Sequence, residues 1–148
     1  MINRYETFTI LVNNINRSIR KIKNEEMKDF NLKSNHVSCL YFLYKRGTLT
    51  ATELTDLCDE DKAAISRSLD YLEKNGYIKC ESQAKKRYKT DLSLTEKGME
   101  VGKFICDKID KVLEKSSFGL SEEKLAIFYE GLNLINENLN RIIETGEE

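Results

Sequence analysis

The chain has 148 residues, with 24 lysines and arginines against 25 aspartates and glutamates, so its formal net charge is −1. This length predicts one domain with a core of its own, and the absence of a run of 18 or more apolar residues argues against a transmembrane helix. The first ten residues lack the apolar core and cleavage site of a signal peptide, so we expect a cytoplasmic protein.

Residues 3–28 are predicted to form an amphipathic helix. Their apolar side chains recur at alternating spacings of three and four residues, which is the pattern of a coiled-coil seam. The seam consists of Ile2, Tyr5, Phe8, Val12, Ile15, Ile19 and Ile22.

A second helix is expected within residues 31–46, with Ser34 as its N-cap and Gly47 as its end. Its apolar face consists of Val37, Leu40, Tyr41, Leu43 and Tyr44. The following pair, Thr48 and Leu49, is predicted to add a short strand to the sheet described below.

Residues 50–76 predict two short helices joined by a tight turn. Thr50 and Glu53 form a T-x-x-E capping box at the first helix start, and either Asp59 or Asp61 can cap the second. Gly76 suits the left-handed residue that ends a helix. The apolar positions are Ala51, Leu54, Leu57 and Cys58 in the first helix, then Ile65, Leu69 and Leu72 in the second. This arrangement is typical of a helix-turn-helix.

The polar face of the second helix has small and basic residues in its first two turns. They are Lys62, Ala63, Ala64, Ser66 and Arg67. A recognition helix, expected here over residues 61–75, reads base edges with its N-terminal residues. Arg67 can donate two hydrogen bonds to guanine, and Ser66 can reach a base or a phosphate. Taken alone, the pattern fits a solvated helix face equally well.

Residues 77–81 and 91–94 alternate like strands, and a basic segment lies between them. Its four cationic side chains are Lys85, Lys86, Arg87 and Lys89. A hairpin with a basic tip directly after a helix-turn-helix predicts a winged helix whose wing contacts phosphates or the minor groove. Lys62 and the edge formed by Thr50 and Thr52 are predicted to meet phosphates as well. The predicted wing has a net charge of +4, whereas residues 120–148 hold two basic and seven acidic residues. The nearly neutral chain therefore has a local basic patch.

Two further helices are expected, over residues 95–115 and 121–144, the first linking the wing to the second. The last one repeats the three-and-four spacing of the N-terminal helix. Long apolar stripes on a chain in water need a partner surface, so we predict that the two terminal helices pack together and also against those of a second copy. The alternative is that they pack only on each other. The predicted dimer interface comprises Tyr5, Phe8, Val12, Ile15, Phe128, Leu132, Ile135 and Leu139.

Two signatures flank the basic hairpin. L-E-x-x-G-x-I covers residues 72–78, and L-T-E-K-G covers residues 94–98. Together they resemble the MarR/SlyA family of winged helix-turn-helix transcription regulators, and the resemblance extends over essentially the whole chain. It implies a mainly α fold with a small β-hairpin wing, in one domain. Residues 1–30 and 116–148 are then dimerisation helices, about 31–95 the winged-helix lobe, and 95–115 the connecting helix.

The resemblance also implies a homodimer that binds a palindromic site on double-stranded DNA, as a repressor, and releases it when a small aromatic effector binds. No cofactor and no membrane partner are implied. One departure concerns the wing. The family commonly places an aspartate shortly before the wing arginine, whereas residues 83–86 are Gln, Ala, Lys and Lys. How Arg87 is held is therefore left open.

Other functions have weaker support. A nucleophilic pair of His36 and Cys39 is conceivable on one helix face, but no third orienting group accompanies it, so we do not expect an enzyme. No metal site is expected from one histidine and four widely spaced cysteines. Two alternatives stay open: a regulator that senses oxidants through Cys39 or Cys58, and a winged helix that binds only proteins.

Overall fold

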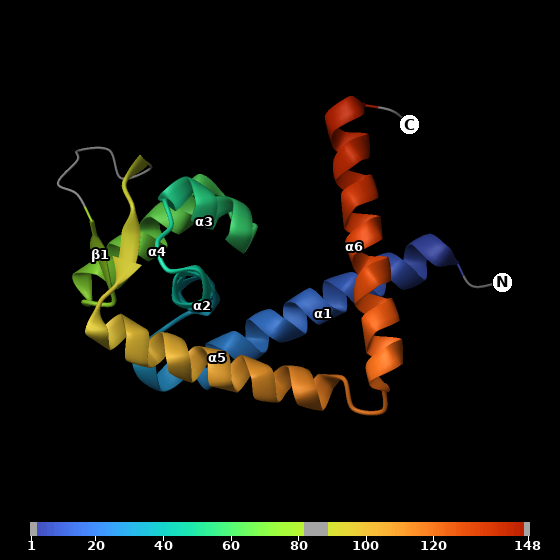
Figure 1. The fold of residues 1–148 in the computed structure, drawn as a ribbon, viewed down its shortest axis with the longest axis horizontal. Helices are drawn as coiled ribbons and strands as arrows, with labels where there is room; N and C mark the ends of the chain where they lie inside the picture. Colours follow the sequence, from blue (N-terminus) through green and yellow to red (C-terminus); the bar gives the residue numbers. More distant parts are fainter. Residues whose placement is uncertain (1–2, 82–88, 147–148) are drawn as a thin grey trace. The chain divides into compact units, whose positions relative to one another are not determined.

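The computed structural model describes residues 3–81 and 89–146 (Figure 1). In chain order the elements are α1 (Arg4–Glu26), the 3-10 helix η1 (Lys28–Phe30), α2 (Ser34–Arg46), α3 (Ala51–Cys58), α4 (Lys62–Lys74), β1 (Ile78–Cys80), β2 (Leu92–Leu94), α5 (Glu96–Ser116) and α6 (Glu122–Thr145). The predicted mainly helical fold with one β-hairpin is confirmed. The chain divides into two compact units, Met1–Asp107 and Lys108–Glu148, whose boundary falls within α5.

The predicted helix-turn-helix is α3 followed by α4. The capping box forms as expected, since the Glu53 backbone N–H donates to Thr50 Oγ1 at 3.2 Å and the Thr50 N–H donates to Glu53 Oε2 at 2.7 Å. Asp61 caps α4 by accepting a hydrogen bond from the Ala64 N–H at 2.7 Å. Asp59 instead ends α3 in a left-handed conformation with φ 50°. Both helix starts were therefore predictable from short-range side-chain chemistry.

The two sequence signatures meet where α4 leads into the hairpin. Gly76 has φ +76°, as a left-handed helix stop requires. Thr95, from L-T-E-K-G, donates its backbone N–H to the Tyr77 carbonyl at 3.0 Å. A Cβ on Gly98 would lie 2.0 Å from that same carbonyl oxygen, so only glycine fits there. Gly76 thus allows α4 to end, and Gly98 allows the first turn of α5 to lie against Tyr77, just beyond α4.

β1 and β2 pair antiparallel, with Ile78 opposite Leu94 and Cys80 opposite Leu92. The predicted third strand is present as a single bridge from Leu49 to Leu92. β1 packs against α4, and β2 packs against α2 (Figure 1). The hairpin is thereby anchored to the helix-turn-helix.

The first unit has a closed apolar core. Each large apolar side chain fully removed from water contributes about 1.5–3 kcal/mol. Side chains below 2% exposure come from α2, α3, α4, β2 and α5 and from Met27, which follows α1; those in the helices and the strand include Leu40, Leu43, Leu54, Ile65, Leu69, Leu72, Leu92 and Ile105. α1 contributes no buried residue. The core therefore belongs to the winged-helix lobe and the first half of α5.

The start of α2 differs from the prediction. Ser34 is not the N-cap but the first helical residue, and its backbone N–H donates to Asn24 Oδ1 at 2.7 Å. The N-cap is Lys33, whose backbone N–H donates to His36 Nδ1 at 3.0 Å. Side chains from α1 and from within α2 thus satisfy these donors in place of a serine hydroxyl.

The second unit contains the end of α5 and the whole of α6. Ser121 is the predicted N-cap of α6, and its hydroxyl accepts from the Lys124 N–H at 3.3 Å. Glu122 and Glu123 occupy the favourable first turn. No residue of α6 is buried. No helix within residues 3–81 and 89–146 combines the length and apolarity of a membrane span.

Candidate nucleic-acid interface

One face of α4 is open to water while the opposite face lies in the core. Ile65, Leu69 and Leu72 have at most 1% exposure, whereas Ser66 and Arg67 are exposed. Lys62 and Ala63, in the first turn, are exposed as well. The predicted base-contacting residues therefore share a solvent face on a helix that the core holds rigidly.

Ala64 is a correction. The sequence analysis assigns Ala64 to the polar face, but in the structure the residue is only 9% exposed and lies in the core. The buried side of α4 is wider than the Ile65/Leu69/Leu72 stripe, because Ala64 and Ser68 flank it and are buried too. Ala64 therefore lets α4 approach its neighbours closely rather than offering a side chain to a ligand.

Asp70 lies on the same helix face and is absent from the sequence prediction. It follows Ser66 by four residues and Arg67 by three, so it adjoins both along the helix surface, and it is exposed. A carboxylate at this position repels phosphates but can accept a hydrogen bond from cytosine N4. The helical spacing alone could have revealed it.

The two threonines at the start of α3 differ in their surroundings. The Thr50 hydroxyl accepts from the Glu53 N–H and donates to Glu53 Oε2 at 3.1 Å, so it already serves as a cap. Thr52, in the first turn, is exposed. Of the predicted phosphate-contacting pair, Thr52 has the more accessible side chain.

The hairpin is described on both sides of its tip. The Glu81 N–H donates to the Asp91 carbonyl at 2.8 Å, and the Ser93 hydroxyl donates to the Glu81 carboxylate. Lys89 is exposed, three residues before the returning strand β2 begins at Leu92. The other predicted wing contacts, Lys85, Lys86 and Arg87, lie outside the described residues.

The single histidine has a packing role. The His36 ring stacks on Tyr71 with centroids 4.3 Å apart and an interplanar angle of 7°. Burial, and secondarily the charge of Lys33, lowers the pKa of His36, which suits its Nδ1 as a hydrogen-bond acceptor. The imidazole is engaged by the Lys33 backbone N–H and by the Tyr71 ring rather than by Cys39. The residues do not form a nucleophile and base pair.

The predicted dimer residues are uncovered in the single chain. In the first unit, Tyr5 is 79% exposed and Ile15 52%, while Phe8 is exposed and Val12 half-buried. In the second unit, the exposed members are Phe128, Ile135 and Leu139, and Leu132 is half-buried. Within each unit the apolar stripe thus faces away from the unit's own residues.

The chain is similar to known proteins in both sequence and fold. The family model described as the MarR family matches residues 30–87. Over 82 residues the chain is 32% identical to the uncharacterized HTH-type transcriptional regulator YwoH of Bacillus subtilis (strain 168), a match covering 53% of this chain and 60% of that protein. The structure of NMB1585, a MarR family regulator from Neisseria meningitidis, superposes with a TM-score of 0.81 at 19% identity, covering 99% of this chain and 100% of that one. Residues 30–87 thus match the MarR family model, and the chain has the fold of the MarR and SlyA structures.

A second MarR structure is similar at higher identity. A putative MarR family transcriptional regulator from Listeria monocytogenes, solved in complex with a 26mer DNA, has a TM-score of 0.79 at 25% identity, with 93% of each chain covered. The matching family model describes the MarR family, and the matching relative is described as a transcriptional regulator. The chain spans 60% and 62% of the lengths of the curated relatives it matches.

Proposed function

We propose that this MarR-like chain is a homodimeric transcription regulator that represses by binding a palindromic operator in double-stranded DNA. The observation that carries the proposal is the solvent face of α4, where Ser66 and Arg67 are exposed above a fully buried stripe. The chain that presents this face is similar in fold to the Listeria regulator that was solved with DNA. A helix anchored in the core with exposed polar residues in its N-terminal turns is the arrangement that major-groove reading requires.

The residues divide into reading and positioning roles. Arg67 and Ser66 contact base edges, with Arg67 suited to guanine O6 and N7. Lys62, Thr52 and the hairpin cations, including Lys89, contact phosphates. Phosphate contacts fix the register of the protein on the duplex, and base contacts specify the sequence.

Two copies are needed because the terminal helices leave their apolar stripes uncovered. α1 and α6 have no buried residue, although both are strongly amphipathic. Pairing of these stripes between two copies removes them from water and relates two α4 helices by a two-fold axis. The half-sites then lie about one helical turn, or about 10 base pairs, apart.

Release by a small aromatic effector is the regulatory part of the proposal. A fold neighbour at 20% identity, a Staphylococcus aureus MarR protein, was solved in complex with salicylate and kanamycin. An effector that releases DNA must bind one spacing of the recognition helices more tightly than the other, because equal affinity shifts no population. In this proposal the chain binds genomic DNA in the cytoplasm, and the effector releases it there.

Selection of genomic fragments by the purified protein tests the proposal. Fragments retained at about 0.15 M salt are sequenced, and the enriched site is compared with a shuffled duplex of equal length. We expect an inverted repeat bound at least about 1,000-fold more tightly than the shuffled duplex. If the chain binds neither duplex even in dilute salt, DNA binding is refuted, and a winged helix that binds only proteins is the function that survives.

A further inference from the structure

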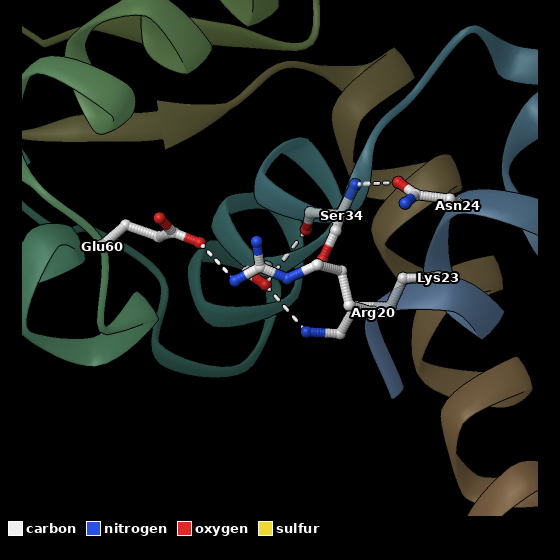
Figure 2. A network of polar contacts seen from close by, with 6 residues as sticks. Arg20, Lys23, Asn24, Ser34 and Glu60 are labelled. Carbon is white, nitrogen blue, oxygen red and sulfur yellow. Dashed lines mark hydrogen bonds and ion pairs between the residues drawn. The ribbon is translucent and has the colours of Figure 1, made fainter. Parts of the chain in front are cut away.

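Three polar side chains of α1 contact the winged-helix lobe. Arg20, Lys23 and Asn24 share one face of the helix, because residues three and four positions apart lie side by side. Figure 2 shows all three reaching from α1 toward Ser34 and Glu60. Lys23 follows an isoleucine of the apolar seam by four residues, so this face adjoins the seam. One helix thus carries both the predicted dimer surface and a set of contacts with the DNA-binding lobe.

Two of these contacts hold α1 to α2. Asn24 Oδ1 accepts the Ser34 backbone N–H at 2.7 Å, and Lys23 Nζ donates to Ser38 Oγ at 2.9 Å. The Ser38 hydroxyl donates to the Ser34 carbonyl at 3.1 Å, which links the two contacts. Met27, just beyond α1, is buried in the core. The C-terminal end of α1 is therefore anchored to the lobe by hydrogen bonds and by apolar burial.

The third contact reaches the turn between α3 and α4. Arg20 Nη2 lies 3.2 Å from Glu60 Oε1 in an ion pair (Figure 2). The Glu60 side chain is 20% exposed and the Arg20 side chain 64%. Glu60 stands between Asp59, which ends α3 with φ 50°, and Asp61, whose side chain caps α4. The ion pair therefore connects α1 to the residue directly before the cap of the proposed recognition helix.

This ion pair is too exposed to contribute much to stability, since water screens the two charges and both side chains lose freedom. Its place along α1 gives it a larger effect on direction. Arg20 lies seven residues from Met27, or about 10 Å along the helix, and Phe8 lies 19 residues, or about 28 Å, from Met27. If α1 tilts about Met27 so that Arg20 moves by about 1 Å, Phe8 moves by about 3 Å. That displacement is close to one base-pair step of about 3.4 Å.

We propose that Arg20 is a positioning residue for DNA binding. Its ion pair with Glu60 fixes the direction of α1 relative to α4, and thereby fixes the half-site spacing that the dimer accepts. This inference rests on the proposed homodimer and its palindromic operator. Three observations carry it: the ion pair ends beside the Asp61 cap, the burial of Met27 anchors one end of α1, and the predicted dimer residue Phe8 lies far from that anchor on the same helix.

The first experiment tests the ion pair in the protein without DNA. Hydrogen exchange in the peptides that cover residues 59–65 is followed by mass spectrometry in the wild type, Arg20→Ala and Glu60→Gln. Exchange should be up to about 5-fold faster in both variants, as expected for the loss of an exposed ion pair. Arg17→Ala removes the same charge three residues earlier, where Arg17 is bonded to Asn14 of its own helix, and should exchange like the wild type. Wild-type exchange in Arg20→Ala overturns the contact.

The second experiment measures the half-site spacing. The spacer of the selected inverted repeat is shortened or lengthened by one base pair, and the affinity for each duplex is divided by that for the original spacer. The wild type should lose about 10-fold in affinity and Arg20→Ala only about 2-fold, a difference typical of the coupling between two sites. Arg17→Ala should follow the wild type. A substitution that merely destabilises the fold lowers the affinity for every spacer alike and leaves this ratio unchanged.

A charge reversal tests whether the two residues act as a pair. Arg20→Glu alone should relax the spacing at least as far as Arg20→Ala, and the double variant Arg20→Glu/Glu60→Arg should restore the wild-type ratio. Glu60→Arg adds a positive charge beside α4 and so raises the affinity for every duplex, but the ratio between spacers removes this contribution. A double variant that stays relaxed overturns the role of Glu60.

Failure of this inference differs from failure of the proposed function. If the wild type binds its inverted repeat and Arg20→Ala keeps the wild-type spacing ratio, the positioning role is overturned and DNA binding stands. If the wild type binds no duplex at any spacing, the proposed function is refuted and the positioning role falls with it. The hydrogen-exchange result then still decides whether Arg20 and Glu60 are paired.

Discussion

The winged-helix lobe and the terminal helices use apolar residues in opposite ways. In the lobe, Leu69 and Leu72 of α4 have no exposed surface, and the core closes within one chain. In α1 and α6 the stripe is just as regular, yet Tyr5 is 79% exposed and Leu139 48%. The same periodicity thus predicts a helix in both regions but not what covers it. The lobe closes its core within one chain, whereas the stripes of the terminal helices are the surfaces that the proposed dimer covers.

The largest effect should come from a charge in the stripe of α6. Ile135→Asp buries an uncompensated carboxylate in the proposed dimer, at a cost of about 3–5 kcal/mol for each copy. We expect a monomer in sedimentation velocity at concentrations where the wild type is a dimer. Asn136→Asp adds the same charge one position on and should leave the dimer intact. A dimer that persists in Ile135→Asp contradicts this use of α6.

A matched pair of leucines sharpens the contrast. Leu69→Ala removes a fully buried side chain, so the free energy of unfolding should fall by about 2–5 kcal/mol at any protein concentration. Leu139→Ala, on the 48% exposed side chain of α6, should destabilise only through association. Urea unfolding at two protein concentrations distinguishes the two effects, because only a loss of association depends on protein concentration. Equal, concentration-independent losses would mean that the two regions do not differ in this way.

Within the lobe, the exposed face of α4 should matter for DNA and not for folding. Arg67→Ala should cost about 1–3 kcal/mol of operator affinity and relax specificity at one base pair, since it removes a bidentate interaction with a base. The unfolding free energy should change by less than about 0.5 kcal/mol. Arg141→Ala, exposed on α6, is the control. Fluorescence anisotropy with single-base operator variants makes the measurement, and an unchanged base preference would remove Arg67 from the reading role.

The smallest effect is expected in the wing. Lys86→Ala should weaken specific and random duplexes alike, and the slope of log K against log salt should flatten by about one unit, because one lysine no longer neutralises a phosphate. Lys111→Ala removes an exposed charge from α5 and should leave the slope unchanged. A variant without Lys85, Lys86 and Arg87 that retains the full slope would argue against any binding of DNA by the wing.

Features that depend on residues close in sequence could be predicted, whereas features that depend on tertiary contacts could not. The Thr50–Glu53 capping box, the Asp61 cap and the left-handed Gly76 depend on residues three or four positions apart, so spacing predicted them. The start of α2 depends on Asn24 from another helix, and spacing could not reveal it.

The candidate site shows the same division. The exposure of Ser66 and Arg67 followed from the helical stripe, but the burial of Ala64 required knowing how closely neighbouring elements approach α4.

The stoichiometry and spacing of the bound complex test the central claim most directly. The purified protein is bound to a selected genomic fragment, its mass is measured, and the duplex is footprinted with hydroxyl radicals. Two chains should occupy one duplex and protect two half-sites whose centres lie about 10 base pairs apart. One chain on one protected half-site, or no protection in dilute salt, would contradict the account.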